Sequence, residues 1–442
     1  MPMLTESPSK PWMPLRRRAT HLIALALIPL ALAACGGSDD DDDEVADNTP
    51  PVTEPAPTPP EDTPSRNTAY LGAKSGDILK VRIEELIPTQ PGLGYDQVYY
   101  KLGRWQGDFD RPTWAADPVL QLDYLNRTVG KKFGDYCEDT GQHDVVEFTS
   151  IDAVRAARLD DPSTFECQSE PGADPDDKAA MKTVVIGWDG NLYLTDGHHS
   201  FSSLREIADG GPKLEVYVRV DANYSDLPTR EAFWQRMVDE NKTWLRDGDN
   251  NSITVDQLPT RLGLANDTEP GGMAEDRYRS LVYFTRDIAY VSGDLPEFAE
   301  FLWGDWIRRK QTAGQIPALS HYNMVANATN VADVLAESAL DENLLKTGDD
   351  FSYPAAVRDV SLIMGTTSEF ELIYGSTTAT ELGRIALVVP NDPDTEDALG
   401  ELEDIARDDT NGDGEPRGAG KLWFSANYRA CGKPAAGTCW GY

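Results

Sequence analysis

Two adjacent histidines, His198 and His199, are the residues of this chain whose types and setting could best support chemistry. They are two of the four histidines that follow the N-terminal segment, and they stand directly after Asp196 and Gly197. Unperturbed imidazole titrates near about pH 6.5, so either histidine could act as a general acid or base. Asp196 could orient an imidazole or bind a divalent metal. Phosphodiester or phosphoryl chemistry would use these groups most fully.

The segments around the histidines predict where they lie in the fold. Apolar runs at 183–186 and 192–194, separated by a turn, predict two strands, and apolar residues from Phe201 onward recur at helical spacing. The histidines therefore lie where a strand passes into a helix N-terminus, whose N–H groups and dipole can bind an anion. In a structural alternative, Asp196 caps this helix and the histidines satisfy buried hydrogen bonds.

A divalent metal site is a further interpretation of the same residues. Asp196, His198 and His199 could bind an ion, joined by His143 or His321. Side chains of adjacent residues usually diverge, however, so two neighbouring histidines on one ion would need an unusual turn. His321 is expected to be structural, and His143 is expected to lie on a polar loop.

A second candidate metal site lies near the C-terminus. Segment 409–415 offers the oxygen ligands Asp409, Asn411 and Asp413 followed by a glycine, as in the first half of a calcium loop. The twelfth position is Gly420, so the bidentate glutamate is missing. An acidic surface loop is the alternative, and a bound calcium ion would be structural.

The N-terminus predicts export. Three arginines at 16–18 precede an apolar segment at 22–34 that is too short to span a bilayer comfortably. Small residues followed by Cys35 resemble a bacterial lipoprotein signal in which Cys35 is lipidated; an ordinary secretory signal is the alternative. We expect residues 1–35 to be the signal peptide. We expect residues 36–67, acidic and proline-rich, to be a disordered tether in the cell envelope, on the periplasmic face of a membrane.

The remaining cysteines predict disulfides in an oxidising compartment. They form an even set, and short loop closure favours the pairs Cys137–Cys167 and Cys431–Cys439, each worth roughly 2–4 kcal/mol. A Cys/His metal site is the alternative, but the spacing lacks two close cysteine pairs.

The net charge of the chain disfavours one class of partner, nucleic acids. The formal net charge is −35, and removal of residues 1–35 takes away four positive charges and one negative, leaving about −38. Nucleic-acid affinity comes mostly from lysine and arginine neutralising phosphates. Non-specific nucleic-acid binding is therefore not expected unless the charge is strongly segregated.

The pattern of apolar residues predicts an α+β fold. Short apolar or alternating segments at 81–83, 183–186, 192–194 and 214–220 predict the strands of a small mixed sheet. From about residue 230 the chain shows aromatic-rich helical stripes. We expect an α/β domain at 68–225 and a helical C-terminal portion at 226–442.

Several motifs resemble, in order, those of the ParB-like nuclease family of the ParB/sulfiredoxin superfamily. The opening signature is Ile83–Leu86 with Pro88–Gln90, Gly94 and Lys101, and the central motif is Leu194–His199. The helical continuation comprises Phe233–Met237, Asp276–Leu281 and Phe298–Trp306. The resemblance covers about residues 78–310.

The resemblance implies a small α/β domain whose strand-to-helix turn cradles nucleotide phosphates. The residues placed at this pocket are Asp196, Gly197, His198, His199 and Ser200, with Gln90 and Lys101 as neighbours. Lys101 could offset phosphate charge. The chain has histidines where the superfamily's partition proteins have arginines, and it lacks the cysteine of the sulfinic-acid reductase, so neither activity transfers. The acidic charge and the export signal count against a nuclease.

We therefore expect an exported, lipid-anchored protein that binds a phosphate-containing ligand at 196–199 and hydrolyses a phosphodiester or nucleotide phosphate. ATP and CTP are scarce outside the cytoplasm, which argues against an energy-consuming role. The alternative is a non-catalytic module for envelope binding or protein interaction. Histidines that are buried and individually hydrogen-bonded would remove most of the support for an enzyme.

Overall fold

The computed structural model describes most of the body of the chain. The described residues are 66–106, 117–291, 293, 295–296, 298–322, 353–387, 398, 401–402, 408–410 and 416–432. All of them belong to one compact unit, Thr63–Tyr442. Within these ranges no helix has the length and apolar character needed to cross a membrane. Cys35 and the expected tether up to residue 65 lie outside the described residues.

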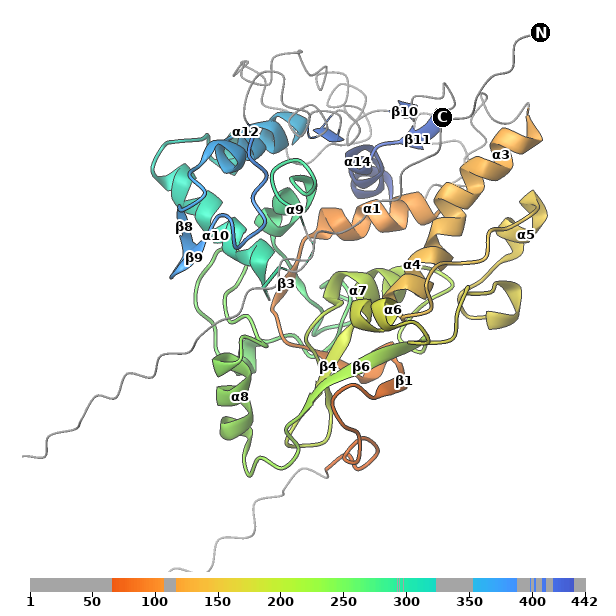
Figure 1. The fold of residues 1–442 in the computed structure, drawn as a ribbon, viewed down its shortest axis with the longest axis horizontal. Helices are drawn as coiled ribbons and strands as arrows, with labels where there is room; N and C mark the ends of the chain where they lie inside the picture. Colours follow the sequence, from red (N-terminus) through yellow and green to blue (C-terminus); the bar gives the residue numbers. More distant parts are fainter. Residues whose placement is uncertain are drawn as a thin grey trace, which may run out of the picture. The chain divides into compact units, whose positions relative to one another are not determined.

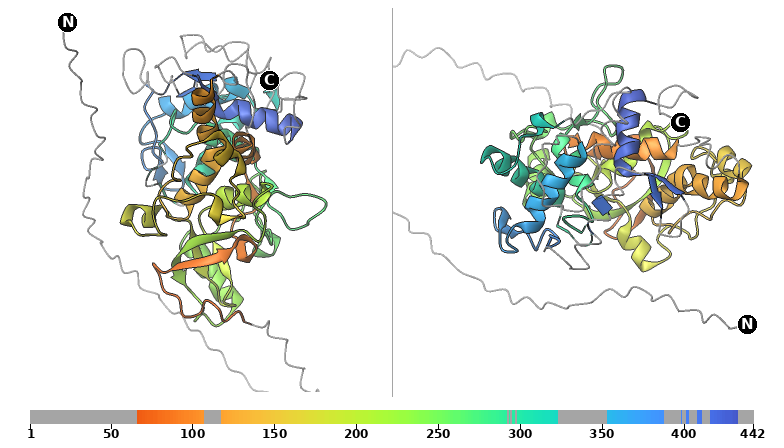
Figure 2. Two further views of the ribbon diagram at one scale, coloured as in Figure 1. Left: turned by 90° about the vertical axis from the view of Figure 1, so that its right-hand side faces the viewer. Right: turned by 90° about the horizontal axis from the view of Figure 1, so that it is seen from above.

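A five-stranded mixed sheet lies at one end of the described body, opposite the helix α12 (Figures 1 and 2). Its strands are β1 (Ile78–Arg82), β2 (Leu86–Pro88), β4 (Thr183–Ile186), β5 (Leu192–Leu194) and β6 (Glu215–Asn223). Their order is β1-β6-β4-β5-β2. Neighbours β1–β6 and β4–β5 are antiparallel, whereas β6–β4 and β5–β2 are parallel.

Helices cover both faces of the sheet because its central strands are apolar on both sides. In β4, Val184 and Ile186 join one core and Val185 joins another. The first core includes α1 (Tyr95–Trp105), α4 (Lys131–Asp139) and α7 (His198–Glu206). The second core includes α8 (Arg230–Asp239). Shorter helices are α3 (Pro118–Leu125), α5 (Ile151–Ala156) and α6 (Pro175–Ala180); α3 contacts α5, and α6 contacts α4.

A mostly helical portion follows the sheet, and the predicted α+β class is confirmed. Its helices are α9 (Arg277–Phe284), α10 (Ala299–Thr312), α12 (Tyr353–Thr366) and α14 (Lys421–Cys431). Trp303 and Trp306 are fully buried in the core of this portion. Three small sheets pair β3 (Gly92–Leu93) with β7 (Ala274–Glu275), β8 (Leu372–Tyr374) with β9 (Thr377–Thr378), and β10 (Asp408–Thr410) with β11 (Pro416–Ala419).

Two contacts join the helical portion to the chain around the sheet, namely a strand pairing and a helix packing. Strand β3 runs directly into α1 and pairs in parallel with β7, which precedes α9. Helix α1 also packs extensively against α14 (Figure 1). The expected domain boundary near residue 225 stays a prediction.

The predicted disulfide between Cys137 and Cys167 is present and ties α4 to the segment after α5. Cys431 is the last residue of α14, and its predicted partner Cys439 lies outside the described residues. The second disulfide therefore stays a prediction.

The calcium loop also stays a prediction. Asp409 belongs to β10, whereas Asn411 and Asp413 lie outside the described residues.

Candidate functional site

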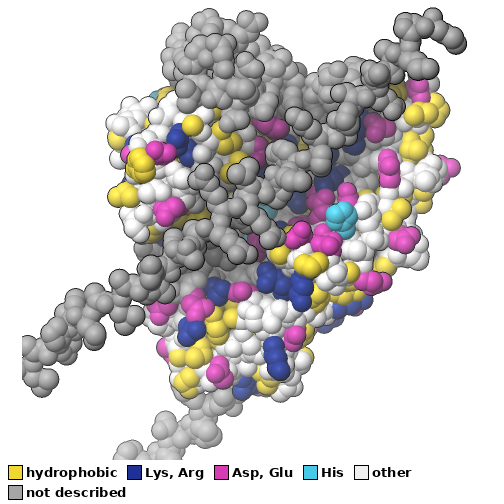
Figure 3. Space-filling model, viewed as in Figure 1, with side chains coloured by type: hydrophobic (Ala, Val, Ile, Leu, Met, Phe, Trp, Pro, Cys, Tyr) yellow, Lys and Arg dark blue, Asp and Glu magenta, His cyan; other side chains and the backbone are white. Residues whose placement is uncertain are grey.

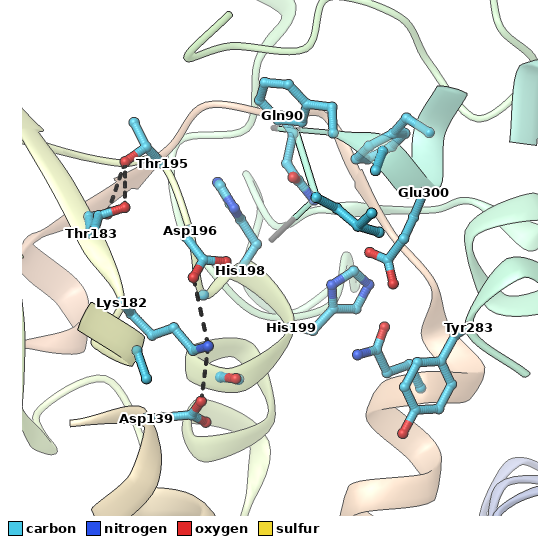
Figure 4. Close-up of a pocket in the computed structure, with 18 of the residues that line it drawn as sticks. Gln90, Asp139, Lys182, Thr183, Thr195, Asp196, His198, His199, Tyr283 and Glu300 are labelled. Carbon is cyan, nitrogen blue, oxygen red and sulfur yellow. Dashed lines mark hydrogen bonds and ion pairs between the residues drawn. The ribbon is translucent and has the colours of Figure 1, made fainter. Parts of the chain in front are cut away.

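A cavity of about 740 Å³ is lined by residues from both the sheet and the helical portion. All seven residues predicted to form the pocket line it, namely Gln90, Lys101, Asp196, Gly197, His198, His199 and Ser200. Figure 4 shows Lys182 and Asp196 on one side of this cavity and Glu300 on the other, with the two histidines between them.

Gly197 makes the turn that starts α7. Its φ is +103°, in the left-handed region that favours glycine, and a Cβ atom there would lie 2.7 Å from Cγ of Lys182. The first bond within the helix runs from the N–H of Phe201 to the carbonyl of Gly197 at 2.9 Å. The N–H groups of residues 198–200 therefore have no partner inside the helix, and these residues line the cavity.

Both histidines are buried and accept hydrogen bonds from the backbone. The N–H of Thr89 donates to Nε2 of His198 at 3.2 Å, and the N–H of Gly94 donates to Nε2 of His199 at 2.9 Å. The two imidazoles thus fasten segment 89–94, which links β2 to α1, onto the start of α7. This is the hydrogen-bonding role that the structural alternative gave them.

The same environment keeps both imidazoles neutral. Burial, with a smaller contribution from Arg279, lowers the pKa of His198 to about 3. Burial and then Arg279 also hold the pKa of His199 well below its usual range. An imidazole with so low a pKa is a weak base near neutral pH. It is also not protonated there, so it cannot act as an imidazolium acid. General acid–base catalysis by either histidine therefore loses support.

The tautomer of His199 leaves a donor directed at the cavity. Because Nε2 accepts a hydrogen bond, the single proton of the neutral ring resides on Nδ1. This Nδ1 lies 3.5 Å from Nη2 of Arg279, which is also a donor. Two donors cannot bond to each other, so an acceptor from a ligand would satisfy both.

Asp196 forms an ion pair with a lysine, and the hydrogen bonds of His198 and His199 described above are to other groups. Its side chain is 57% exposed, and Oδ2 lies 3.6 Å from Nζ of Lys182, which lies 3.2 Å from Oδ1 of Asp139 (Figure 4). The N-cap residue of α7 is Gly197, with no side-chain hydrogen bond, so Asp196 does not cap the helix as the structural alternative had it. Burial alone would lower the pKa of Lys182, but the two carboxylates outweigh it and raise that pKa.

The two residues from the opening signature lie on the cavity wall with partners of their own. Lys101 Nζ lies 3.5 Å from Oδ2 of Asp135 and 3.8 Å from Oδ2 of Asp139. The side-chain amide of Gln90 donates to the carbonyl of Gly92 at 2.9 Å. Lys101 is therefore partly neutralised, and Gln90 shapes the turn before α1.

Arg279 is a buried cation of the cavity lining that the sequence analysis did not identify as a site residue. Its side chain is 4% exposed, and Nη2 lies 2.6 Å from Oε2 of Glu300. Nε and Nη1 are buried and have no hydrogen-bond partner within the described part of the chain. Arg279 and Glu300 lie in helices whose sequences show mainly apolar stripes. A charged residue at a buried position of such a helix is the sequence feature that could have pointed to them.

The cavity is positive although the protein is acidic. Five cationic side chains line it against three carboxylates; the cations are Lys101, Lys182, Arg219, Arg279 and Arg286, and the carboxylates are Asp139, Asp196 and Glu300. With both imidazoles neutral, the lining carries a net positive charge.

The residues of the divalent-metal interpretation are not gathered into one group in the described part of the chain. Among the described residues there is no group of three or more His, Cys, Asp or Glu side chains that could hold a metal ion. The imidazole nitrogens of His198 and His199 face backbone donors, and His143 bonds Asp177 at 3.1 Å on the surface. His321 lies in a short 3-10 helix, Leu319–His321.

One comparison with known proteins identifies a family. The model of the family described as "Putative ParB-like nuclease" matches residues 79–309. No curated protein matches the chain. Among solved structures, the crystal structure of protein Atu1540 from Agrobacterium tumefaciens is similar, at 16% sequence identity and a TM-score of 0.35, over 66% of this chain and 93% of that one.

Proposed function

Because this chain belongs to the ParB-like nuclease family, we propose that its cavity binds a phosphate-containing ligand and hydrolyses a phosphodiester or nucleotide phosphate there. The observation that carries the proposal is Arg279, a buried guanidinium with two unpartnered donors in a positively charged cavity. Buried polar groups are nearly always hydrogen-bonded, and an unpaired one is costly. A phosphate oxygen would supply the missing acceptors through strong, charge-assisted bonds.

The other cavity donors support an anion of this kind. The open N–H groups of residues 198–200, the Nδ1–H of His199 and the side chain of Lys182 all belong to the cavity wall. Phosphate has several oxygen atoms, so it can contact a helix N-terminus and several cations at the same time, which a monatomic anion cannot do. The two histidines act in this proposal as neutral positioning groups that fix the turn.

Glu300 is the cavity carboxylate that we assign to hold and orient the attacking water in hydrolysis. Burial would raise its pKa, but Arg279 and Arg286 outweigh burial and lower it, so the carboxylate is ionised. Water held by Glu300 attacks phosphorus, the phosphorus–oxygen ester bond breaks, the attacking water loses its proton to solvent, and the leaving oxygen takes a proton from solvent.

A binding module without turnover is the second candidate. It is favoured by the hydrogen bonds that occupy Nε2 of His198 and His199. Phosphate binding is common to both candidates, and only turnover separates them.

The binding test uses inorganic phosphate and thermal unfolding of the full chain. A ligand at 100 times its Kd stabilises the fold by about 2.7 kcal/mol, so wild type is expected to gain several degrees. Arg286→Gln, which removes a cavity charge with no ion pair of its own among the described residues, is expected to reduce the gain. Arg230→Gln, whose partner Asp256 is exposed, is the matched control. No stabilisation of wild type by phosphate would refute the proposal.

The catalytic test compares turnover of bis-p-nitrophenyl phosphate and of a nucleoside triphosphate, with and without Mg²⁺ or Mn²⁺. Arg279→Gln alone would leave Glu300 without its counterion, so the informative variants are Glu300→Gln and the double Arg279→Gln/Glu300→Gln. Loss of turnover with retained phosphate binding in Glu300→Gln supports the hydrolase. Phosphate binding without turnover in wild type supports the binding module.

The proposal places the protein in the cell envelope, attached through lipidated Cys35. The supporting feature is the signal-like segment before Cys35, followed by an acidic, proline-rich stretch. Incorporation of labelled palmitate in a bacterial host should occur in wild type and disappear in Cys35→Ser. Labelling of both chains would contradict lipidation at Cys35.

A further inference from the structure

One wall of the cavity is aromatic and does not take part in the phosphate contacts. We propose that the ligand carries a flat apolar ring close to its phosphate, and that Phe298 is the side chain that binds this ring. The inference rests on the proposed phosphate site and adds a preference for phosphates that carry an aromatic ring. Its ligand class is an aryl or heteroaryl phosphate.

Phe298 has an unusual backbone for its residue type. Its φ is +60° at the residue that precedes α10, although it is neither glycine nor asparagine. Such a conformation costs of the order of 1–3 kcal/mol and persists only where the surroundings enforce it, often at a ligand site. The side chain is half-buried and lines the cavity.

Among the aromatic residues that line the cavity, Phe298 is half-buried, whereas Tyr283, Tyr290 and Phe301 are buried. Phe301 is stacked on Trp244 with ring centroids 5.0 Å apart and an interplanar angle of 25°. The guanidinium carbon of Arg279 lies 4.9 Å from the centroid of Phe301. Phe301 is thus packed on both sides and buried, whereas Phe298 lies 6.0 Å from Phe301 edge-on and 6.0 Å from Trp244 and stays half-buried.

The cationic and aromatic walls adjoin at Arg279. The same guanidinium has two unpartnered donors and lies against Phe301, which contacts Phe298. A phosphate held by Arg279 therefore brings its organic substituent directly onto the aromatic wall. Leu295 and Pro296 extend this wall, and about 740 Å³ holds a phosphate together with a ring.

A flat ring suits this wall better than a sugar or a chain. Aromatic groups gain from offset or edge-to-face contacts in addition to the burial of apolar area. A polar sugar placed against this wall would gain no hydrogen bond from the side chains of Phe298, Leu295 and Pro296.

The test measures binding of inorganic phosphate, phenyl phosphate and hexyl phosphate to the full chain by calorimetry. Wild type is expected to bind phenyl phosphate about ten-fold more tightly than inorganic phosphate, with hexyl phosphate between them. Phe298→Leu is expected to reduce the preference for phenyl phosphate over hexyl phosphate to about one, and Phe298→Tyr is expected to restore it.

Phe370→Leu is the matched control, because Phe370 is 75% exposed and outside the cavity lining, and it should keep the wild-type preference. Equal binding of phenyl and hexyl phosphate by wild type would overturn the ring site while leaving the phosphate site intact. A preference unchanged by Phe298→Leu would overturn the role of Phe298. Failure of all three ligands to bind would instead refute the proposed function.

Discussion

At the scale of single residues, burial decides what the histidines can do. His198 and His199 sit beside a cationic cavity, and each accepts a backbone hydrogen bond at Nε2. Both features stabilise the neutral ring, because a charged ring would lose solvation and face Arg279. The pair therefore acts as a fixed hydrogen-bond acceptor set for segment 89–94.

This protonation state predicts a dependence of stability on pH. The folded pKa of His198 is about 3, whereas an unfolded histidine has a pKa of about 6.5. Between these values the unfolded chain binds the proton, so stability is present above pH 6.5 and is lost as the pH falls toward 3. From pH 7.5 to 5.5, the free energy of unfolding of wild type should fall by about 1.4 kcal/mol more than that of His198→Gln.

Urea unfolding at the two pH values checks this difference. The control is His143→Gln, since the hydrogen bond to Asp177 raises the pKa of exposed His143 and gives it the opposite linkage. His143→Gln should not flatten the pH dependence. Identical slopes for wild type and His198→Gln would contradict the buried neutral imidazole.

Gly197 offers a second test at this scale. Gly197 and Gly211 have nearly equal φ values, +103° and +105°, but a Cβ at Gly211 would meet no atom within 4 Å. Gly211→Ala should therefore lower the free energy of unfolding only through the strain of an alanine in the left-handed conformation, by about 1–2 kcal/mol. Gly197→Ala must also displace Lys182, and overpacking adds about 1–3 kcal/mol.

The free energies of unfolding of the two alanine variants, measured in urea, check this comparison. Gly197→Ala should also weaken phosphate binding, because Lys182 and the start of α7 move together. Equal costs for the two variants would mean that Lys182 does not pack against the turn.

At the scale of elements, α1 is held between the site and the C-terminal helix. Its first turn carries Asp96, whose Oδ1 lies 2.7 Å from Nη2 of Arg429 on α14, and Oδ2 accepts from Tyr353 at 2.8 Å. Glu275, in β7, also pairs with Arg429 at 2.6 Å. Arg429 lies outside the family match of 79–309, so a helix beyond the matched residues helps to position α1.

Arg429→Met should therefore destabilise the protein strongly. Burial raises the pKa of Asp96 against the opposing effect of Arg429, so removal of Arg429 leaves a buried carboxylate without its counterion. Breaking such a pair costs about 3–5 kcal/mol, as measured by urea unfolding. Adding Asp96→Asn to Arg429→Met should recover part of the loss.

The control is Lys80→Met, because Lys80 and Glu215 are about half exposed and such pairs contribute about 0–1 kcal/mol. A loss for Arg429→Met no larger than that of Lys80→Met would show that the α14 contact does not hold α1.

The local elements of the site could be predicted from the sequence because their signals are local. The strand-to-helix turn at 196–199 follows from apolar spacing and a glycine, and all its residues line the cavity. Asp139, Lys182, Arg279 and Glu300 come from separate segments, and only the three-dimensional fold brings them together. Burial of the imidazoles, and hence their low pKa, also depends on packing that spacing does not reveal.

The strands themselves were predictable, but their order was not. Alternation and β-branched runs predict strands such as β4 and β6. The parallel pairing of β2 with β5 and of β3 with β7 joins segments far apart in sequence. No short-range pattern encodes those partners.

At the scale of the whole molecule, the cavity contrasts with the rest of the chain. The net charge is −35, and Asp and Glu side chains are spread over the face seen in Figure 3. Long-range repulsion then disfavours polyanions, whereas a small phosphate needs only the cations inside the cavity. If the cavity binds phosphate as proposed, we expect it to accept small phosphate compounds and expect the acidic surface to repel polymeric phosphates.

A labelled 20-base-pair duplex should consequently show no binding to the full chain at 50 mM salt, measured by fluorescence anisotropy up to about 100 µM protein. Proteins that bind duplexes non-specifically do so through many lysine and arginine contacts, with Kd values of about 10⁻⁴ to 10⁻⁶ M and a steep salt dependence. Inorganic phosphate should bind under the same conditions, which controls for the integrity of the cavity. Duplex binding that weakens as salt is added would mean that a basic surface overrides the net charge of −35, and it would return polymeric nucleic acid to the substrates of this site.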